Sequence, residues 1–77
     1  MKNLVKVERV RRNLQQQELA RILNISRQAL YAMETGKFTP SVHLAIKIAT
    51  LFYMKVEDLF FLEPSDIIPL KDYIKPT

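Results

Sequence analysis

The sequence predicts a single compact all-α domain of five short helices, followed by a short extended C-terminal tail. A chain of 77 residues can bury only one small core. With 48% hydrophobic and 26% charged residues, its composition is that of a globular protein. Apolar residues recur at helical spacing between helix-starting and helix-stopping residues. We therefore divide the chain into a domain over residues 1–62 and a tail over 63–77.

The first two expected helices lie before position 24. Asn3 suits the N-cap of a first helix of roughly ten residues, whose last turn is basic, as the helix dipole favours. Asn13 suits a left-handed residue that ends this helix. A second helix is expected over 16–23, with Leu19, Ala20 and Leu23 facing inward, and Asn24 interrupts it.

Cap and stop residues also define the next two helices. Ser26 suits the N-cap of a third helix that extends through Thr35, and Gly36 suits its stop. The pair Pro40-Ser41 then marks the start of a fourth helix, which is apolar enough over 42–52 to be well buried.

The fifth helix and the tail have a different character. Residues 56–62 are expected as a short helix with Glu57 and Asp58 in its first turn, where the dipole favours acids. Beyond Glu63, three prolines favour an extended path. The tail is nevertheless apolar at Ile67, Ile68, Leu70, Tyr73 and Ile74. We expect the fifth helix and part of this tail to form a two-fold interface between two copies of the chain; the alternative is that the tail packs on its own domain.

The charge is unevenly divided along the chain. Residues 1–54 hold nine lysines and arginines against three glutamates, whereas residues 55–77 hold three lysines against five acids. A basic front and an acidic back suit a polyanionic partner on one face, and ordinary surface charge is the alternative.

Several function classes are excluded by composition. The chain has no cysteine, one histidine (His43) and one glycine (Gly36), so it lacks the residues for disulfides, metal sites and phosphate-binding glycine loops. No nucleophile–base pair is present, and we expect neither enzyme activity nor a cofactor. The longest apolar stretch, 48–54, is too short to span a bilayer, and no signal peptide is visible. We expect a soluble, cytoplasmic protein without membrane or metal partners.

Residues 16–35, QQELARILNISRQALYAMET, meet the requirements of a helix-turn-helix. Ala20 supplies a small residue where two helices touch, and Asn24 tolerates the positive φ that the turn requires. Apolar residues that face the rest of the domain come from both sides of the turn. These are Ile25, Leu30 and Met33 in the third helix and Leu19 and Leu23 in the second.

With these motifs the sequence resembles the Cro/cI-type, or XRE-type, helix-turn-helix regulators related to the lambda repressor. The matching motifs are LQQQELA at 14–20, ISRQ at 25–28, METGK at 33–37, PS at 40–41 with LA at 44–45, and EDLF at 57–60. The resemblance covers roughly residues 3–62. It implies a lambda-repressor-like domain that acts as a homodimeric transcriptional regulator, of repressor type, on a palindromic double-stranded DNA operator.

The outward face of the third helix supplies the candidate base-reading residues. They are Arg27, Gln28, Tyr31 and Ala32. Arginine bonds guanine and glutamine bonds adenine in a bidentate way, and the first turn of a recognition helix reaches base edges. Arg27 and Gln28 therefore suit direct reading, although both are also ordinary residues for an exposed turn. Tyr31 suits a contact with a phosphate or a thymine methyl. The alternative is that Tyr31 is a half-buried surface aromatic. Ala32 leaves room for a thymine methyl.

A second set of residues is expected at the DNA backbone. The set comprises Gln16, Ser26, Thr35, Lys37, Thr39 and Arg11. The resemblance implies that Gln16 bonds a phosphate and braces Gln28, and that the loop holding Lys37 and Thr39 follows the backbone. For Lys37 a solvated lysine is the alternative. Such contacts position a protein on DNA without specifying sequence.

Glu34 falls on the inward side of the third helix beside Met33, where a carboxylate needs a partner. In the resembled family the glutamate at this position pairs with an arginine of the first helix, which is Arg9 in this sequence. We expect a structural ion pair between Arg9 and Glu34.

One other class of function stays open at this point. A protein-interaction module, or an antitoxin with an added protein partner, can be built on the same fold. Polar residues at the start of the third helix and the basic front favour DNA binding over such a module.

Overall fold

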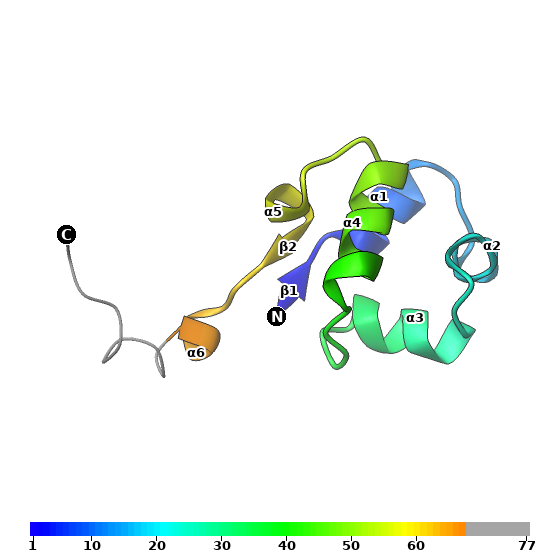
Figure 1. Ribbon diagram of the computed structural model, residues 1–77. Coiled ribbons are helices and arrows are strands. Elements are labelled where there is room, and N and C mark those ends of the chain that lie inside the picture. Colours follow the sequence, from blue (N-terminus) through cyan, green and yellow to red (C-terminus); the bar gives the residue numbers. More distant parts are fainter. Residues whose placement is uncertain (68–77) are drawn as a thin grey trace.

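The computed structural model describes residues 1–67, which form six helices and a two-stranded antiparallel sheet (Figure 1). The elements are β1 (Lys2–Asn3), α1 (Val5–Arg11), α2 (Gln16–Leu23), α3 (Arg27–Glu34), α4 (Val42–Leu51), α5 (Val56–Leu59), β2 (Phe60–Phe61) and α6 (Pro64–Ile67). The predicted all-α fold class is confirmed, with one minimal sheet added to it.

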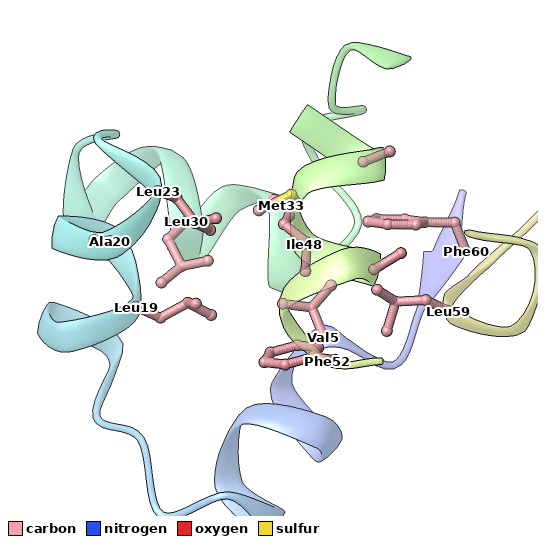
Figure 2. Close-up of a cluster of buried hydrophobic side chains, with 12 residues drawn as sticks. Val5, Leu19, Ala20, Leu23, Leu30, Met33, Ile48, Phe52, Leu59 and Phe60 are labelled. Carbon is pink, nitrogen blue, oxygen red and sulfur yellow. The ribbon is translucent and has the colours of Figure 1, made fainter. Parts of the chain in front are cut away.

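Helix α4 occupies the middle of the domain. Figure 1 places α2 and α3 on one side of it, and α5 with the sheet on the other. The same division is visible in the core, where Leu19 and Leu30 lie on one side of Ile48 and Leu59 lies on the other (Figure 2). Because each of these side chains is inaccessible to solvent, every helix from α2 to α5 contributes to one continuous core.

The prediction that Asn3 caps the first helix is wrong. Asn3 lies in β1, and α1 begins at Val5 and has 7 residues instead of roughly ten. The Asn3 carboxamide accepts a hydrogen bond from the Val5 N–H at 3.1 Å and donates one to the Met33 carbonyl at 2.8 Å. Asn3 therefore connects the start of α1 to the end of α3.

The fifth helix is shorter than predicted because the chain turns into a strand. It ends at Leu59, and Phe60 and Phe61 pair with Asn3 and Lys2, respectively. The Leu4 N–H extends this pairing by donating to the Leu59 carbonyl at 2.9 Å. Pairing with a segment at the other end of the described chain overrides the local helical pattern.

The tail does not begin as an extended segment. Residues 64–67 form the single turn of α6, and Pro64 suits its first position because the first helical N–H needs no partner. The Glu63 N–H donates to the Asp66 carboxylate at 2.8 Å across this turn. The predicted tail residues Ile68, Leu70, Tyr73 and Ile74 lie outside the described residues, and the division at 62/63 stays a prediction.

Helices α1 to α4 all end with the same hydrogen-bond pattern. A residue with positive φ follows each helix, namely Asn13, Asn24, Gly36 and Tyr53. The next N–H donates to the carbonyl five residues earlier, at 2.8 to 3.1 Å, in the pairs Leu14–Arg9, Ile25–Ala20, Lys37–Ala32 and Met54–Ala49. This is the Schellman motif, which satisfies carbonyls left over at a helix end. The predicted left-handed positions of Asn13 and Asn24 are confirmed.

Tyr53 is the unexpected member of this set. Its φ of 56° costs an L-residue with a large side chain about 1–2 kcal/mol, whereas asparagine and glycine adopt it readily. Its side chain makes no compensating contact with the domain, since the residue is 97% exposed. Nothing in the described structure stabilises this conformation apart from the backbone bonds of the helix end.

Replacing Tyr53 therefore relieves backbone strain without loss of packing. We expect Tyr53→Asn to raise the free energy of unfolding by about 0.5–1 kcal/mol, measured by urea denaturation. Tyr53→Phe keeps the strained backbone and serves as the matched control, with unchanged stability. A Tyr53→Asn variant no more stable than wild type would show that the backbone at this position is unstrained.

Candidate nucleic-acid interface

The turn between α2 and α3 brings two helix N-termini to one face of the domain. Asn24 takes a φ of 56°, and the Ile25 N–H donates back to the Ala20 carbonyl at 3.0 Å. Ala20 is 4% exposed, so its small side chain lies in the core where the two helices approach. Ser26 then starts α3, with its hydroxyl oxygen accepting the Ala29 N–H at 3.0 Å, as the sequence predicts.

Helix α3 has a buried face and an exposed one. Leu30 and Met33 are inaccessible to solvent. The opposite face consists of exposed Arg27, Gln28, Tyr31 and Thr35, with Ala32 half-buried among them. The predicted base-reading side chains are therefore available to a ligand from solvent, and they occupy the first two turns of the helix.

Three of these residues share a concave surface with the start of α2. A hollow of about 580 Å³ is lined by Gln16, Arg27, Gln28 and Tyr31. Residues at 16 and at 27–31 are separated in sequence, and the tight turn at Asn24 brings them together. One guanidinium, two carboxamides and a phenol thus face one space, and each of them can donate a hydrogen bond.

Gln16 makes a different contact from the one that the resemblance implies. Its Nε2 donates to Oε1 of Glu34 at 3.0 Å. Within residues 1–67 no hydrogen bond joins Gln16 to Gln28, and the bracing of Gln28 by Gln16 stays a prediction. Gln16 is thereby fixed to the far end of α3, while Gln28 on the first turn keeps its full hydrogen-bonding capacity.

Glu34 is the centre of a buried polar network. Its side chain is 2% exposed, and Arg9 binds it through Nε to Oε2 at 2.7 Å and Nη2 to Oε1 at 3.4 Å. Arg9 is itself 10% exposed and donates through Nη1 to the Leu14 carbonyl at 2.8 Å. With Gln16 included, the carboxylate connects α1, the loop before α2, the start of α2 and the end of α3.

The other residues that the sequence predicts to contact the DNA backbone lie at separate places in the structure. Lys37 and Thr39 are exposed in the loop that follows Gly36. The Thr35 hydroxyl donates to the carbonyls of Tyr31 and Ala32 at 3.0 and 3.1 Å, so its proton is used within its own helix. Arg11 is 71% exposed and lies 3.6 Å from Glu8. It is the last residue of α1 and does not line the hollow at the start of α3.

One polar cluster at the ends of α1 and α4 was not predicted from the sequence. The Arg12 guanidinium lies 4.6 Å from the centre of the Phe52 ring and donates to the Phe52 carbonyl at 2.6 Å and to Glu8 at 2.7 Å. Arg12 thereby caps the C-terminus of α4 with a positive charge. The spacing of Glu8 and Arg12, four residues apart in a helix, is the signal that predicts the Glu8–Arg12 bond but not the one to Phe52.

Removal of the Glu34 carboxylate tests the buried network. Glu34→Ala leaves the Arg9 guanidinium buried without its counter-ion, and we expect the free energy of unfolding to fall by about 3–5 kcal/mol. Urea denaturation of Glu34→Ala, Arg9→Ala and the double variant measures the coupling. Asp58→Ala, at an exposed aspartate of α5, is the control and changes stability little. Small, additive losses in the two single variants would show that the pair is uncoupled.

Among residues 1–67, no helix is long and apolar enough to cross a membrane, and no cluster of three metal-ligating side chains occurs. The candidate site is the polar hollow lined by Gln16, Arg27, Gln28 and Tyr31.

The short α2, the left-handed turn and the exposed polar face of α3 define a helix-turn-helix protein. A family model described as Helix-turn-helix matches residues 5–59. An uncharacterized HTH-type transcriptional regulator of Methanocaldococcus jannaschii is 47% identical over 66 residues, which cover 86% of this chain and 100% of the relative. The HTH-type regulator YgzD of Bacillus subtilis is 44% identical over 63 residues, covering 82% and 96%. A regulator of Archaeoglobus fulgidus is 36% identical over 67 residues, covering 87% and 94%.

The chain therefore belongs to the XRE-type helix-turn-helix family of transcriptional regulators. This is a class of DNA-binding proteins and not a class of enzymes. The resemblance seen in the sequence is confirmed over almost all of the domain.

Proposed function

We propose that this protein is a sequence-specific regulator of repressor type that reads the major groove of a palindromic operator as a cytoplasmic homodimer. The observation that carries the proposal is the shared hollow of Gln16, Arg27, Gln28 and Tyr31. It joins side chains suited to base edges with the N-terminus of α2, which suits a phosphate.

The two ends of α3 have separate tasks in this proposal. Arg27 and Gln28 at the first turn contact bases, and Tyr31 and Ala32 one turn later contact a thymine methyl or the sugar-phosphate edge. The far end of the helix is fixed by Glu34, which is held by Arg9 and Gln16. A fixed far end sets the angle at which the first turn enters the groove, and accurate angles are needed for bidentate hydrogen bonds.

Phosphate contacts come from the exposed polar groups on either side of α3. Ser26 uses its hydroxyl oxygen as a helix cap and keeps its O–H proton for a phosphate. Lys37 and Thr39 lie beyond the other end of the helix. Such contacts supply affinity that depends on salt, while the first turn of α3 supplies specificity.

Selection from random duplex DNA tests the proposal directly. We expect the wild-type chain to enrich a two-fold symmetric sequence, and Gln28→Ala to lose about 1–3 kcal/mol of preference at one base pair per half-site. Gln17→Ala, at an exposed glutamine outside the hollow, is the control and retains the wild-type preference. Absence of any enriched sequence would favour the protein-interaction module, and an unchanged motif for Gln28→Ala would remove Gln28 from the reading set.

Lys37 is expected to act without regard to sequence. We expect Lys37→Ala to weaken binding to all duplexes alike and to lower the slope of log affinity against log salt by about one per subunit. Lys55→Ala, at an exposed lysine before α5, is the matched control and leaves the slope unchanged. A Lys37 variant with the wild-type slope would place the loop away from the phosphates.

A further inference from the structure

The side chain of Asn3 holds the last turn of α3 from the side of the sheet. Its Nδ2 donates to the Met33 carbonyl at 2.8 Å. The same carbonyl accepts the Gly36 N–H at 3.0 Å, so it receives as many hydrogen bonds as it has lone pairs. Because Asn3 binds the main chain of the helix, its contact does not depend on the rotamer of any α3 side chain.

The Asn3 carboxamide cannot turn away from α3 without losing a second hydrogen bond. Its Oδ1 accepts the N–H of Val5, the first residue of α1, at 3.1 Å. One side chain thus fixes the start of α1 with its acceptor and the end of α3 with its donor. A serine or an aspartate at position 3 can also accept the N–H two residues on, but neither has an amide N–H to donate to Met33.

The main chain of Asn3 is itself anchored to the core. Asn3 pairs with Phe60 in the sheet, and the next N–H, that of Leu4, donates to the Leu59 carbonyl at 2.9 Å. Leu59 is inaccessible to solvent and Phe60 is 7% exposed, and both side chains lie in the buried cluster (Figure 2). The contact with α3 therefore starts from a packed part of the domain.

Strand β1 also lies against the turn that ends α3. Gly36 takes a φ of 80°, and a methyl group at this position would lie 3.3 Å from the Met1 carbonyl oxygen. Lys2, Asn3, Thr35 and Gly36 are among the residues that line one hollow of about 260 Å³ at this junction. The end of α3 is thus approached by the main chain of the β1 segment as well as by the Asn3 side chain.

We propose that Asn3 is a positioning residue for base reading, which holds the last turn of α3 so that Arg27 and Gln28 on the first turn meet the base edges. The inference rests on the proposed function and deepens it, since it adds a second hold on the helix end that carries Glu34. Gln28 lies about 7.5 Å from Met33 along the helix axis, so a tilt of about 10° at the last turn displaces it by about 1 Å. A displacement of this size spoils a bidentate hydrogen bond to a base.

Asn3→Ser separates the two bonds of this side chain, because serine keeps an acceptor for the Val5 N–H and loses the donor to Met33. We expect the affinity ratio between the enriched operator and the same operator with the Gln28 base pair changed to fall about fivefold or more. Affinity for unrelated duplex DNA stays unchanged, since it depends on phosphate contacts.

Val56→Ala is the matched control for this variant. Val56 is partly buried against the core from α5, on the other side of α4 from α3 (Figure 1). Its truncation lowers stability through lost packing, and we expect it to keep the wild-type affinity ratio. Urea denaturation verifies that both variants are folded under the conditions of the binding measurement.

A double-mutant cycle shows whether Asn3 acts through the first turn of α3. In a Gln28→Ala background we expect Asn3→Ser to leave discrimination at that base pair unchanged, since the side chain that it positions has been removed. Equal losses from Asn3→Ser with and without Gln28 overturn the positioning role. An equal loss of affinity for all duplexes, or a loss matched by Val56→Ala, also overturns it, because lower stability alone gives either result.

Residual dipolar couplings of the full chain test the inference without DNA. We expect the orientation of α3 relative to α4 to differ between Asn3→Ser and the wild type, and to be unchanged in Val56→Ala. An unchanged orientation of α3 in Asn3→Ser overturns the inference whatever the binding data give. A chain that enriches no DNA sequence overturns the proposed function instead, and the couplings then decide separately whether Asn3 holds α3.

Discussion

A carboxylate buried at the end of α3 is the constraint on which the arrangement of the helices depends. A charge that is 2% exposed must be neutralised where it lies, because the interior cannot solvate it. Arg9 from α1 and Gln16 from α2 meet this need, so a shift of either helix relative to α3 removes one of the partners of Glu34. Asn3 also connects β1 to the end of α3, because its side chain donates a hydrogen bond to the Met33 carbonyl, one residue before Glu34. The packing of apolar side chains stabilises the domain, and this polar network fixes where α1 and α2 meet the end of α3.

The helices in the middle of the chain were predictable because the residues that delimit them act locally. Asn24, Ser26, Gly36 and Ser41 each satisfy or end the backbone hydrogen bonds of their own helix, and the bounds of α2 to α4 follow from them within a residue or two. The sheet was not predictable in the same way. Its strands have two residues each, too few to show an alternating pattern, and they pair across almost the whole described chain. Tyr53 gives no sign in the sequence that it ends a helix, because its side chain opposes the conformation that the backbone adopts there.

The exposed face of α3 also followed from the sequence, since the helical repeat separates Leu30 and Met33 from Arg27, Gln28 and Tyr31. The hydrogen-bond partner of Gln16 could not be predicted from the sequence. Gln28 lines the same hollow as Gln16, but the Gln16 amide donates to the charged carboxylate of Glu34. A carboxylate accepts a stronger hydrogen bond than a neutral amide does. The end of α3 that carries Glu34 is thus held by charge-assisted hydrogen bonds, whereas Gln28 on the first turn is not. A pattern of residue types does not reveal this difference.

The pairing of β1 with β2 has a consequence for the order in which the domain is assembled during translation. Because residues 60–61 are made after residues 2–3 and all the helices from α1 to α5, the first strand has no partner until most of the described chain has been made. The contacts between α2 and α3 join residues within about twenty positions of each other, so they are available earlier in the nascent chain. The local contacts of the helix-turn-helix can therefore form before the pairing that joins β1 to β2.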